Sequence, residues 1–207
     1  MNRAQTIPRK NTCTQWIAGL RGREVWRFFA PLGLVCLVAL AQAPSEYEVK
    51  AAFLFNFAKF VEWPAGTFPG TNAPFRICVL GKDPFGSTLD RIVAEKTLDE
   101  RRIEVDRSMT LADAKNCQIL FLASSEARRM AQIVQQLKAG GVLTVADTSG
   151  FAQMGGMINF VLQDDHVRFE INLRAAEAAH LKLSARLVTV AERVLGEDEA
   201  GVSPRRP

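Results

Sequence analysis

The sequence contains only two histidines and four cysteines among its 207 residues. The histidines, His166 and His180, share no ligand spacing with any cysteine, so we do not expect a metal site. Two histidines also supply little general acid–base chemistry, and no nucleophile-elbow glycines are found around Asp147-Thr148-Ser149. These shortages weigh against hydrolase chemistry. We therefore predict a protein that is not an enzyme and that needs no cofactor.

Long hydrophobic runs are missing as well. The uncharged apolar run at residues 28–40 has thirteen residues, whereas a membrane-spanning helix needs about 20. A basic segment, residues 21–27, precedes the run, and small residues follow at Ala39 and Ala41, the alternate positions that a signal peptidase reads. We therefore predict a cleaved secretory signal at residues 1–41 and a periplasmic protein. A retained membrane anchor is the alternative.

Removing this segment also removes the excess of positive charge. The whole chain has 26 Lys and Arg against 22 Asp and Glu, whereas residues 42–207 hold 20 basic and 21 acidic residues. No basic run remains to neutralise phosphates, so we do not expect nucleic acid as a partner. The remaining length suits one compact domain, which we predict over residues 42–196. A charged tail at residues 197–207 is predicted to be disordered.

Two cysteines, Cys78 and Cys117, remain after the predicted cleavage. Export favours a disulfide, and both residues lie in or beside apolar, strand-like runs that could be neighbours in a sheet. Closing the loop between them would stabilise the fold by about 3–4 kcal/mol. Two buried free thiols are the alternative.

Residues 157–172 contain two runs of alternating apolar and polar residues on either side of Asp164-Asp165, which predicts a β-hairpin with a two-residue turn. Counting outward from the turn gives the pairs on the apolar face: Leu162 with Val167, Phe160 with Phe169, and Ile158 with Ile171. The other face pairs Asn159 with Glu170, Val161 with Arg168, and Gln163 with His166. We expect the apolar face to be buried and the polar face to be solvated or used for binding.

Before the hairpin, strand-like and helix-like segments alternate. This order predicts an α/β fold: a mostly parallel sheet with helices on both faces, extended by a C-terminal antiparallel β-hairpin. We expect helices at 49–62, 87–96 and 124–137, a loop or short helix at 111–116, and strands at 75–80, 102–107, 118–123 and 142–146. After the hairpin we expect a short helix at 173–179, capped by Asn172, and a last helix from Ser184 to about residue 195.

Two loops at strand ends were candidate ligand sites. Residues 81–86 partly resemble a phosphate loop, but the lysine before the hydroxyl is absent and Pro84 removes an N–H group, so we interpret them as an ordinary turn. Residues 147–149 lie where α/β folds bind ligands. The polar face of the hairpin is the better candidate, although its residues alone favour a solvated face with a local ion pair.

Several segments, in this order, resemble the YfiR family of periplasmic proteins. They are KAAFLFNFAKFVEWP (50–64), ICVLGKDPFG (77–86), ILFLASSE (119–126), GGMINF (155–160), FEIN (169–172) and the pattern AA…A.LK.S.RL…A that ends at Ala191. The resemblance covers nearly all of residues 47–195. The positions of Cys78 and Cys117 resemble those of family members that form a disulfide there. A second cysteine pair of some members has no counterpart in this chain, so the resemblance carries over no redox role that depends on it.

The resemblance implies a regulator. Better-known members bind the periplasmic sensory region of an inner-membrane diguanylate cyclase and repress it, and an OmpA-like outer-membrane lipoprotein sequesters the repressor. Cyclic di-GMP then rises and favours biofilm formation. Carried over residue by residue, partner or ligand contacts fall at Ile158, Phe160, Arg168, Glu170 and Asn172.

Two of these residues, Ile158 and Phe160, are also predicted core residues, so a binding role for them requires a partly open sheet face. The alternative function is a periplasmic small-molecule sensor that feeds a histidine kinase or a transport system. The sequence leaves a homodimer open.

Overall fold

The computed structural model describes residues 43–107 and 110–196. The predicted signal at 1–41 and the predicted tail at 197–207 lie outside the described residues. The helices are α1 (Glu46–Phe60), α2 (Ser87–Val93), α3 (Met130–Leu137), α4 (Leu173–Ala178) and α5 (Ala185–Thr189), with two 3₁₀ turns, η1 (Asp113–Asn116) and η2 (Ser124–Glu126). None of the helices in the described ranges is long and apolar enough to cross a membrane.

A mixed sheet with a parallel centre organises the described part of the chain. Its strands are β2 (Phe75–Leu80), β3 (Thr97–Leu98), β4 (Arg101–Asp106), β5 (Ile119–Leu122), β6 (Leu143–Ala146), β7 (Ile158–Gln163), β8 (His166–Asn172) and β10 (Arg193–Leu195). They lie in the order β10-β8-β7-β6-β5-β2-β4-β3. The five strands from β7 to β4 are mutually parallel, and β8, β10 and β3 run the opposite way. A separate antiparallel pair joins β1 (Val61–Glu62) to β9 (Lys182–Leu183).

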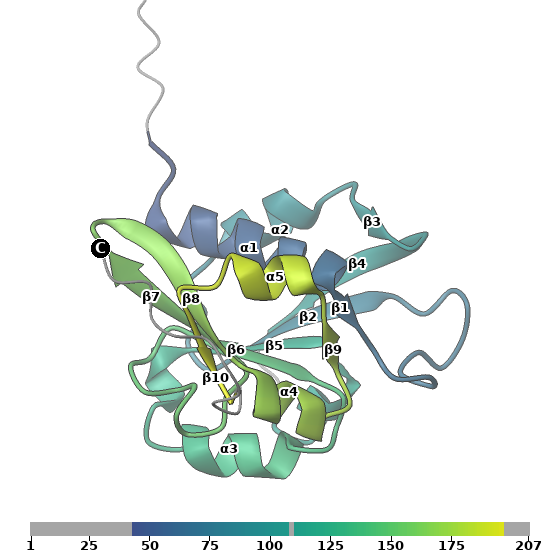
Figure 1. The fold of residues 1–207 in the computed structure, drawn as a ribbon. Coiled ribbons are helices and arrows are strands. Elements are labelled where there is room, and N and C mark those ends of the chain that lie inside the picture. The colour runs from purple at the N-terminus through teal and green to yellow at the C-terminus, as the bar shows by residue number, and fades with distance from the viewer. Residues whose placement is uncertain (1–42, 108–109, 197–207) are drawn as a thin grey trace, which may run out of the picture. The chain divides into compact units, whose positions relative to one another are not determined.

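The central strands are buried on both faces, as parallel strands usually are. Every residue of β5 and β6 is buried, and β2 differs only at Arg76. Helices α1, α2 and α5 lie on one side of the sheet and α3 on the other (Figure 1). Each side therefore has its own apolar cluster, one that includes Phe57 and Phe121 and one that includes Met130 and Phe151. The α/β fold with helices on both faces agrees with the prediction.

Helix α1 begins with a capping box: the Ser45 hydroxyl accepts from the Glu48 N–H, and the Glu48 carboxylate accepts from the Ser45 N–H. Its buried surface includes the charged residue Lys50 beside apolar residues such as Leu54 and Phe57. Phe53 is only half-buried. The helix ends at Phe60, and the chain then enters β1.

The β7–β8 hairpin has the predicted register, with all six residue pairs as counted from the sequence. The turn residues Asp164 and Asp165 have φ of 49° and 60°, the left-handed geometry of a type I′ turn. One expectation for the apolar face is wrong: Leu162, next to the turn, is 57% exposed. It lies beyond the reach of α1, whose Phe53 and Phe57 pack on Phe160 and Phe169 instead.

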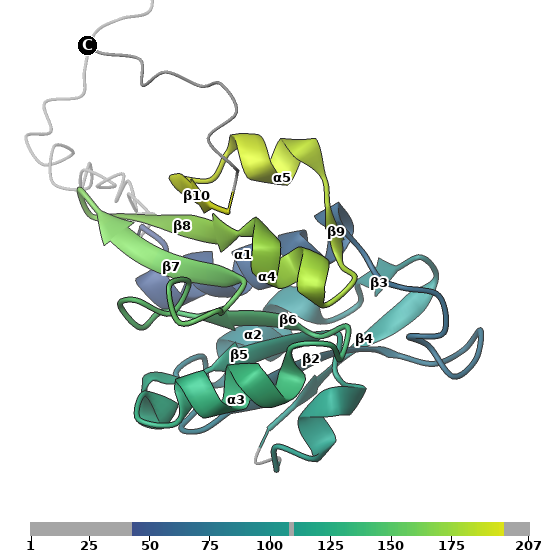
Figure 2. The ribbon, with the colours of Figure 1, turned by 60° about the horizontal axis from the view of Figure 1, so that its bottom comes forward.

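Three predicted helices differ from the structure. The second ends at Val93, because a reversal with Glu95 at φ 59° leads into β3. The predicted helix at 124–137 is divided into η2 and α3, and the Ser125 hydroxyl in η2 accepts from the Lys82 N–H at 2.9 Å. The last helix is wrong beyond Thr189: the chain turns back as β10 along the outer edge of β8 (Figure 2).

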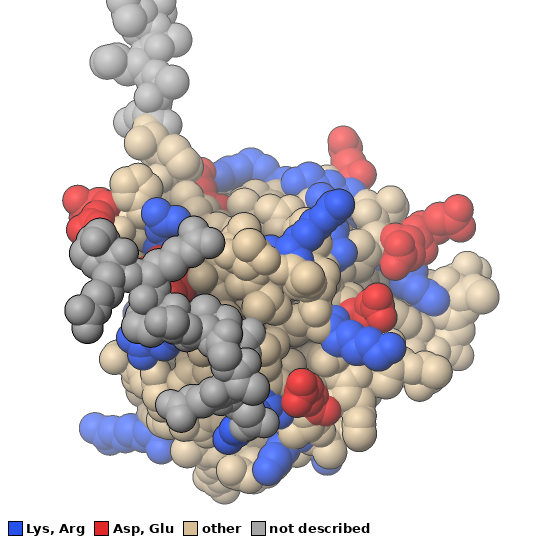
Figure 3. Space-filling view, viewed as in Figure 1, with Lys and Arg blue, Asp and Glu red and all other residues tan. Residues whose placement is uncertain are grey.

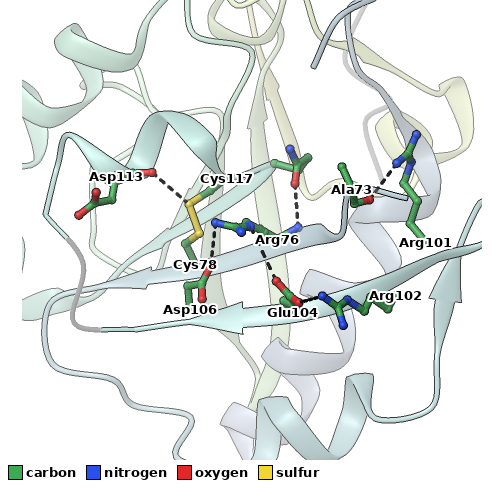
Figure 4. A network of polar contacts seen from close by, with 10 residues as sticks. Ala73, Arg76, Cys78, Arg101, Arg102, Glu104, Asp106, Asp113 and Cys117 are labelled. Atoms are coloured by element: carbon green, nitrogen blue, oxygen red, sulfur yellow. Dashed lines mark hydrogen bonds and ion pairs between the residues drawn. A yellow bond between two sulfur atoms is a disulfide. The ribbon is translucent and has the colours of Figure 1, made fainter. Parts of the chain in front are cut away.

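Cys78 and Cys117 form a disulfide with 6.1 Å between their Cα atoms. Cys78 lies in β2 and Cys117 comes just before β5, the neighbouring strand, as the sequence predicted. Beside the bridge, Arg76 extends from β2 toward Glu104 and Asp106 of β4 (Figure 4). The bridge therefore joins β2, at the centre of the sheet, to the segment that leads into β5.

Candidate functional site

The hairpin extends past the central sheet, and this offset creates the candidate site. Only Ile158 and Asn159 of β7 pair with β6, so the other four residues of β7 continue beyond the carboxyl end of β6. Ligands of open α/β sheets bind at this edge. Asp147, the first residue after β6, faces the hairpin across this step as part of one pocket.

We call this cavity the polar pocket. It measures about 540 Å³ and is lined by residues of three segments: the loop after β6, the hairpin and β10. The lining residues are Asp147, Ser149, Gly150, Gln153, Asn159, Phe160, Val161, Leu162, Glu170 and Arg193.

Sheet register places three of these side chains in one row. Asn159 lies opposite Glu170 across the hairpin, and Glu170 lies beside Arg193 across the β8–β10 pair. Directly paired residues project from the same face of a sheet. The Arg193 guanidinium approaches the Glu170 carboxylate at 3.3 Å. Glu170 is only 7% exposed, whereas the side chain of Arg193 is 63% exposed.

A buried polar network secures the opposite wall of the pocket. The Lys50 ammonium, from α1, donates to Asp147 Oδ2 at 2.7 Å, and the Tyr47 hydroxyl donates to the same oxygen at 3.0 Å. Burial opposes the charge on Lys50, but its hydrogen bonds with Asp147 and Glu46 outweigh this effect and raise its pKa. Burial and the neighbouring Asp147 carboxylate raise the pKa of Tyr47. The network fixes the loop after β6 to helix α1.

Two buried polar atoms at this edge have no hydrogen-bond partner among the described residues. They are Asn159 Oδ1 and Thr148 Oγ1. Asn159 is 1% exposed and lines the polar pocket. Buried polar groups in native proteins are usually paired, and an unpaired one is a sign of a group that a ligand or solvent satisfies.

The structure separates the five residues that the sequence selected. Ile158 and Phe160 are buried in the core beneath α1. Arg168 is exposed and does not line the polar pocket. Asn172 caps α4 by accepting from the Ala175 N–H at 3.0 Å and donates to the Ala152 carbonyl at 2.8 Å. Of the charged candidates, Glu170 alone lies in the pocket.

A second cavity, of about 560 Å³, lies on the same face of the sheet between α3 and α4. Two of its polar residues are already hydrogen-bonded: the buried Thr144 accepts from the Met157 N–H, and the half-buried Asn172 makes the two bonds given above. The polar pocket is therefore the stronger candidate. In the described ranges no group of three His, Cys, Asp or Glu side chains could hold a metal ion, and both histidines are exposed.

On the face seen in Figure 3, Lys and Arg side chains are interspersed with Asp and Glu. Charges of both signs therefore share this face. A family model described as YfiR/HmsC-like matches residues 47–192, a range that includes both cysteines of the disulfide, the hairpin and most of the polar pocket. The chain belongs to the YfiR/HmsC-like family. Proteins of this family are regulatory rather than catalytic.

No curated protein sequence matches this YfiR/HmsC-like chain. Among solved structures it is similar to a conserved domain protein from Vibrio cholerae O1 biovar El Tor, with 10% identity and a TM-score of 0.48, over 72% of this chain and 60% of that one. It is also similar to an ABC domain in complex with L-Trp from Streptococcus pneumonia, with 8% identity and a TM-score of 0.43, over 59% and 55% of the two chains. The chain thus spans less than two thirds of either structure, and these scores are too low to support an argument about function.

Sequence reasoning missed Lys50, Asn159 and Arg193 as parts of the site. A lysine between apolar neighbours in KAAFLFNF indicates a buried charge in need of a partner, and Asp147 at a strand end supplies it. Asn159 was predicted to face Glu170, but not to be buried. Nothing in the sequence indicated Arg193, because β10 itself was not predicted.

Proposed function

We propose that this YfiR/HmsC-like protein is exported to the periplasm and represses an inner-membrane diguanylate cyclase by binding the periplasmic sensory region of the enzyme. Cyclic di-GMP and biofilm formation would then rise when the repressor is removed. The observation that carries this proposal is the family match over residues 47–192. A buried disulfide between neighbouring strands suits an oxidising compartment.

An OmpA-like outer-membrane lipoprotein is the proposed antagonist, which sequesters the repressor and so releases the cyclase. A regulator of this kind needs a binding surface and no reaction centre. The step between the hairpin and the central sheet offers such a surface, with Glu170 and Asn159 in the pocket and Leu162 exposed at its rim.

Deleting the gene and measuring cyclic di-GMP tests this function in cells. We expect the nucleotide level to rise, to return to normal when the gene is restored, and to remain unchanged when the cyclase that the protein represses is deleted together with it. An unchanged level in the single deletion strain would contradict repression.

The polar pocket also supports a second candidate, a small-molecule sensor that feeds a histidine kinase or a transport system. A cavity of about 540 Å³ lies in the size range of small-molecule sites. Native mass spectrometry of protein purified from the periplasm distinguishes the two: a stoichiometric small ligand together with no cyclase binding favours the sensor.

A further inference from the structure

The polar pocket contains a buried hydrogen-bond acceptor that the described residues leave unused. Asn159 Oδ1 is enclosed, and the Asn159 side chain lines the cavity. An unpaired buried acceptor lowers the stability of a fold, because the atom has lost its hydrogen bonds to water. A ligand that brings an N–H donor to this position therefore recovers a bond that the isolated fold lacks.

The groups around Asn159 define the chemistry of that donor. Glu170, its cross-strand partner, and Asp147, at the end of β6, contribute carboxylates, which only accept hydrogen bonds when ionised. Asp147 Oδ2 is occupied by Lys50 and Tyr47. Among the described residues, the Glu170 carboxylate is paired with Arg193 alone, at 3.3 Å, and the Arg193 side chain is mostly exposed. The pocket is thus rich in acceptors and holds one loosely placed cation.

Arg193 indicates which cation the pocket accepts. It lies on β10, a three-residue strand at the edge of the sheet, and reaches Glu170 from the solvent side. A guanidinium has five donors in a rigid plane, so it can bond to a carboxylate and to a neighbouring amide oxygen together. A lysine ammonium has no such planar arrangement.

We propose that the polar pocket binds an arginine side chain of the protein partner and that Arg193 is the intramolecular competitor for Glu170. The incoming guanidinium bonds to Glu170 and Asn159 Oδ1, the two groups that lie side by side on the polar face of the hairpin. That the arginine comes from a cyclase rests on the function proposed above. The chemistry of the pocket does not.

A titration of the purified protein with N-acetyl-L-arginine N-methylamide tests the pocket without any partner. The Asn159 side-chain amide signal in NMR spectra should shift and saturate with this probe. The uncharged citrulline analogue, which has nearly the same shape, should produce no saturable shift.

Three variants make the test specific. Arg193→Gln removes the competitor and should tighten probe binding about two- to fivefold, the range of an exposed ion pair. Glu170→Gln keeps the shape but loses the charge and should weaken binding by about fivefold or more. The matched control Glu177→Gln removes an exposed carboxylate on α4 that does not line the pocket and should change nothing.

The proposal is overturned if the probe leaves Asn159 unshifted, if citrulline binds equally well, or if Arg193→Gln does not tighten binding. Arg193 is exposed, so its replacement tests the idea even if Glu170→Gln proves unstable. Probe binding with no binding of a cyclase would uphold the pocket and remove the proposed partner. Cyclase binding without probe binding would uphold the proposed partner and overturn the proposal that the pocket binds arginine.

Discussion

Lys50 carries a charge inside an apolar helix face, and it is tolerated there because Asp147 and Glu46 both bind its ammonium group. The Lys50 and Asp147 side chains are 6% and 8% exposed, so little water compensates either charge if the other is removed. A buried ion pair of this kind contributes little compared with an apolar pair, but breaking it is costly.

Lys50→Met should therefore lower the free energy of unfolding by about 3 kcal/mol, since it leaves the Asp147 carboxylate buried without its cation. Urea denaturation followed by circular dichroism measures the change. The control is Lys182→Met, which removes a highly exposed pair with Glu62 at 3.9 Å and should change stability by less than about 0.5 kcal/mol. Equal losses in the two variants would show that the network around Asp147 is not structural.

Glu170→Lys tests the function of the polar pocket. The substitution reverses a charge beside Arg193, so we expect loss of repression and a higher level of cyclic di-GMP in cells. The long lysine stem can place its ammonium at the mouth of the pocket, so the melting temperature should fall by less than about 5 °C. Unfolding of the variant at growth temperature would show that Glu170 is structural instead.

At the scale of elements, the hairpin was predictable to the residue because alternation and a two-residue turn together leave one register. The glycine pair before it has a structural reason as well: a Cβ at Gly156 would lie 2.1 Å from the Phe151 ring. The burial of each hairpin residue was less predictable. The alternating pattern does not show how far a helix covers the apolar face of the hairpin. It therefore could not predict that Leu162 is exposed.

Strand β10 could not be predicted from local pattern. Residues 193–195 are too few to distinguish alternation from helical spacing, and the strand exists because the edge of β8 is open for pairing. Arg193 reaches the polar pocket only through this pairing. The candidate site was therefore predictable where the hairpin forms it and unpredictable where β10 completes it.

The turn of the hairpin can be improved. Both turn aspartates have positive φ, a region that costs a non-glycine residue free energy. Asp165→Gly should raise the stability by about 0.5–1 kcal/mol, which thermal denaturation measures as a higher melting temperature. Asp165→Val is the matched contrast and should lower it. Equal stability of the valine and glycine variants would contradict the positive φ of Asp165.

The Cys78–Cys117 bridge closes a loop of 39 residues between β2 and β5. Replacing both cysteines by alanine should lower the free energy of unfolding by about 3–4 kcal/mol, and a reductant should then have no further effect. Denaturation of both proteins with and without dithiothreitol measures this. Finding two freely alkylated thiols in native protein from the periplasm would contradict the disulfide.

At the scale of the whole described domain, one end of the hairpin is packed under a helix and the end near its turn is exposed to solvent. Helix α1 packs on Phe160 and Phe169 and also holds Asp147 through Lys50, so one helix positions both walls of the polar pocket. The residues beyond α1, including Leu162, remain available for a partner. This division of buried and exposed parts suits a protein that acts by binding.

Isothermal titration calorimetry of the purified protein with the periplasmic region of the proposed diguanylate cyclase partner tests repression by binding most directly. We predict saturable binding that Glu170→Lys weakens and Glu177→Gln leaves unchanged, together with slower cyclic di-GMP synthesis by the intact cyclase in membranes. Heat changes no larger than dilution, with cyclase turnover unaffected by saturating protein, would contradict it.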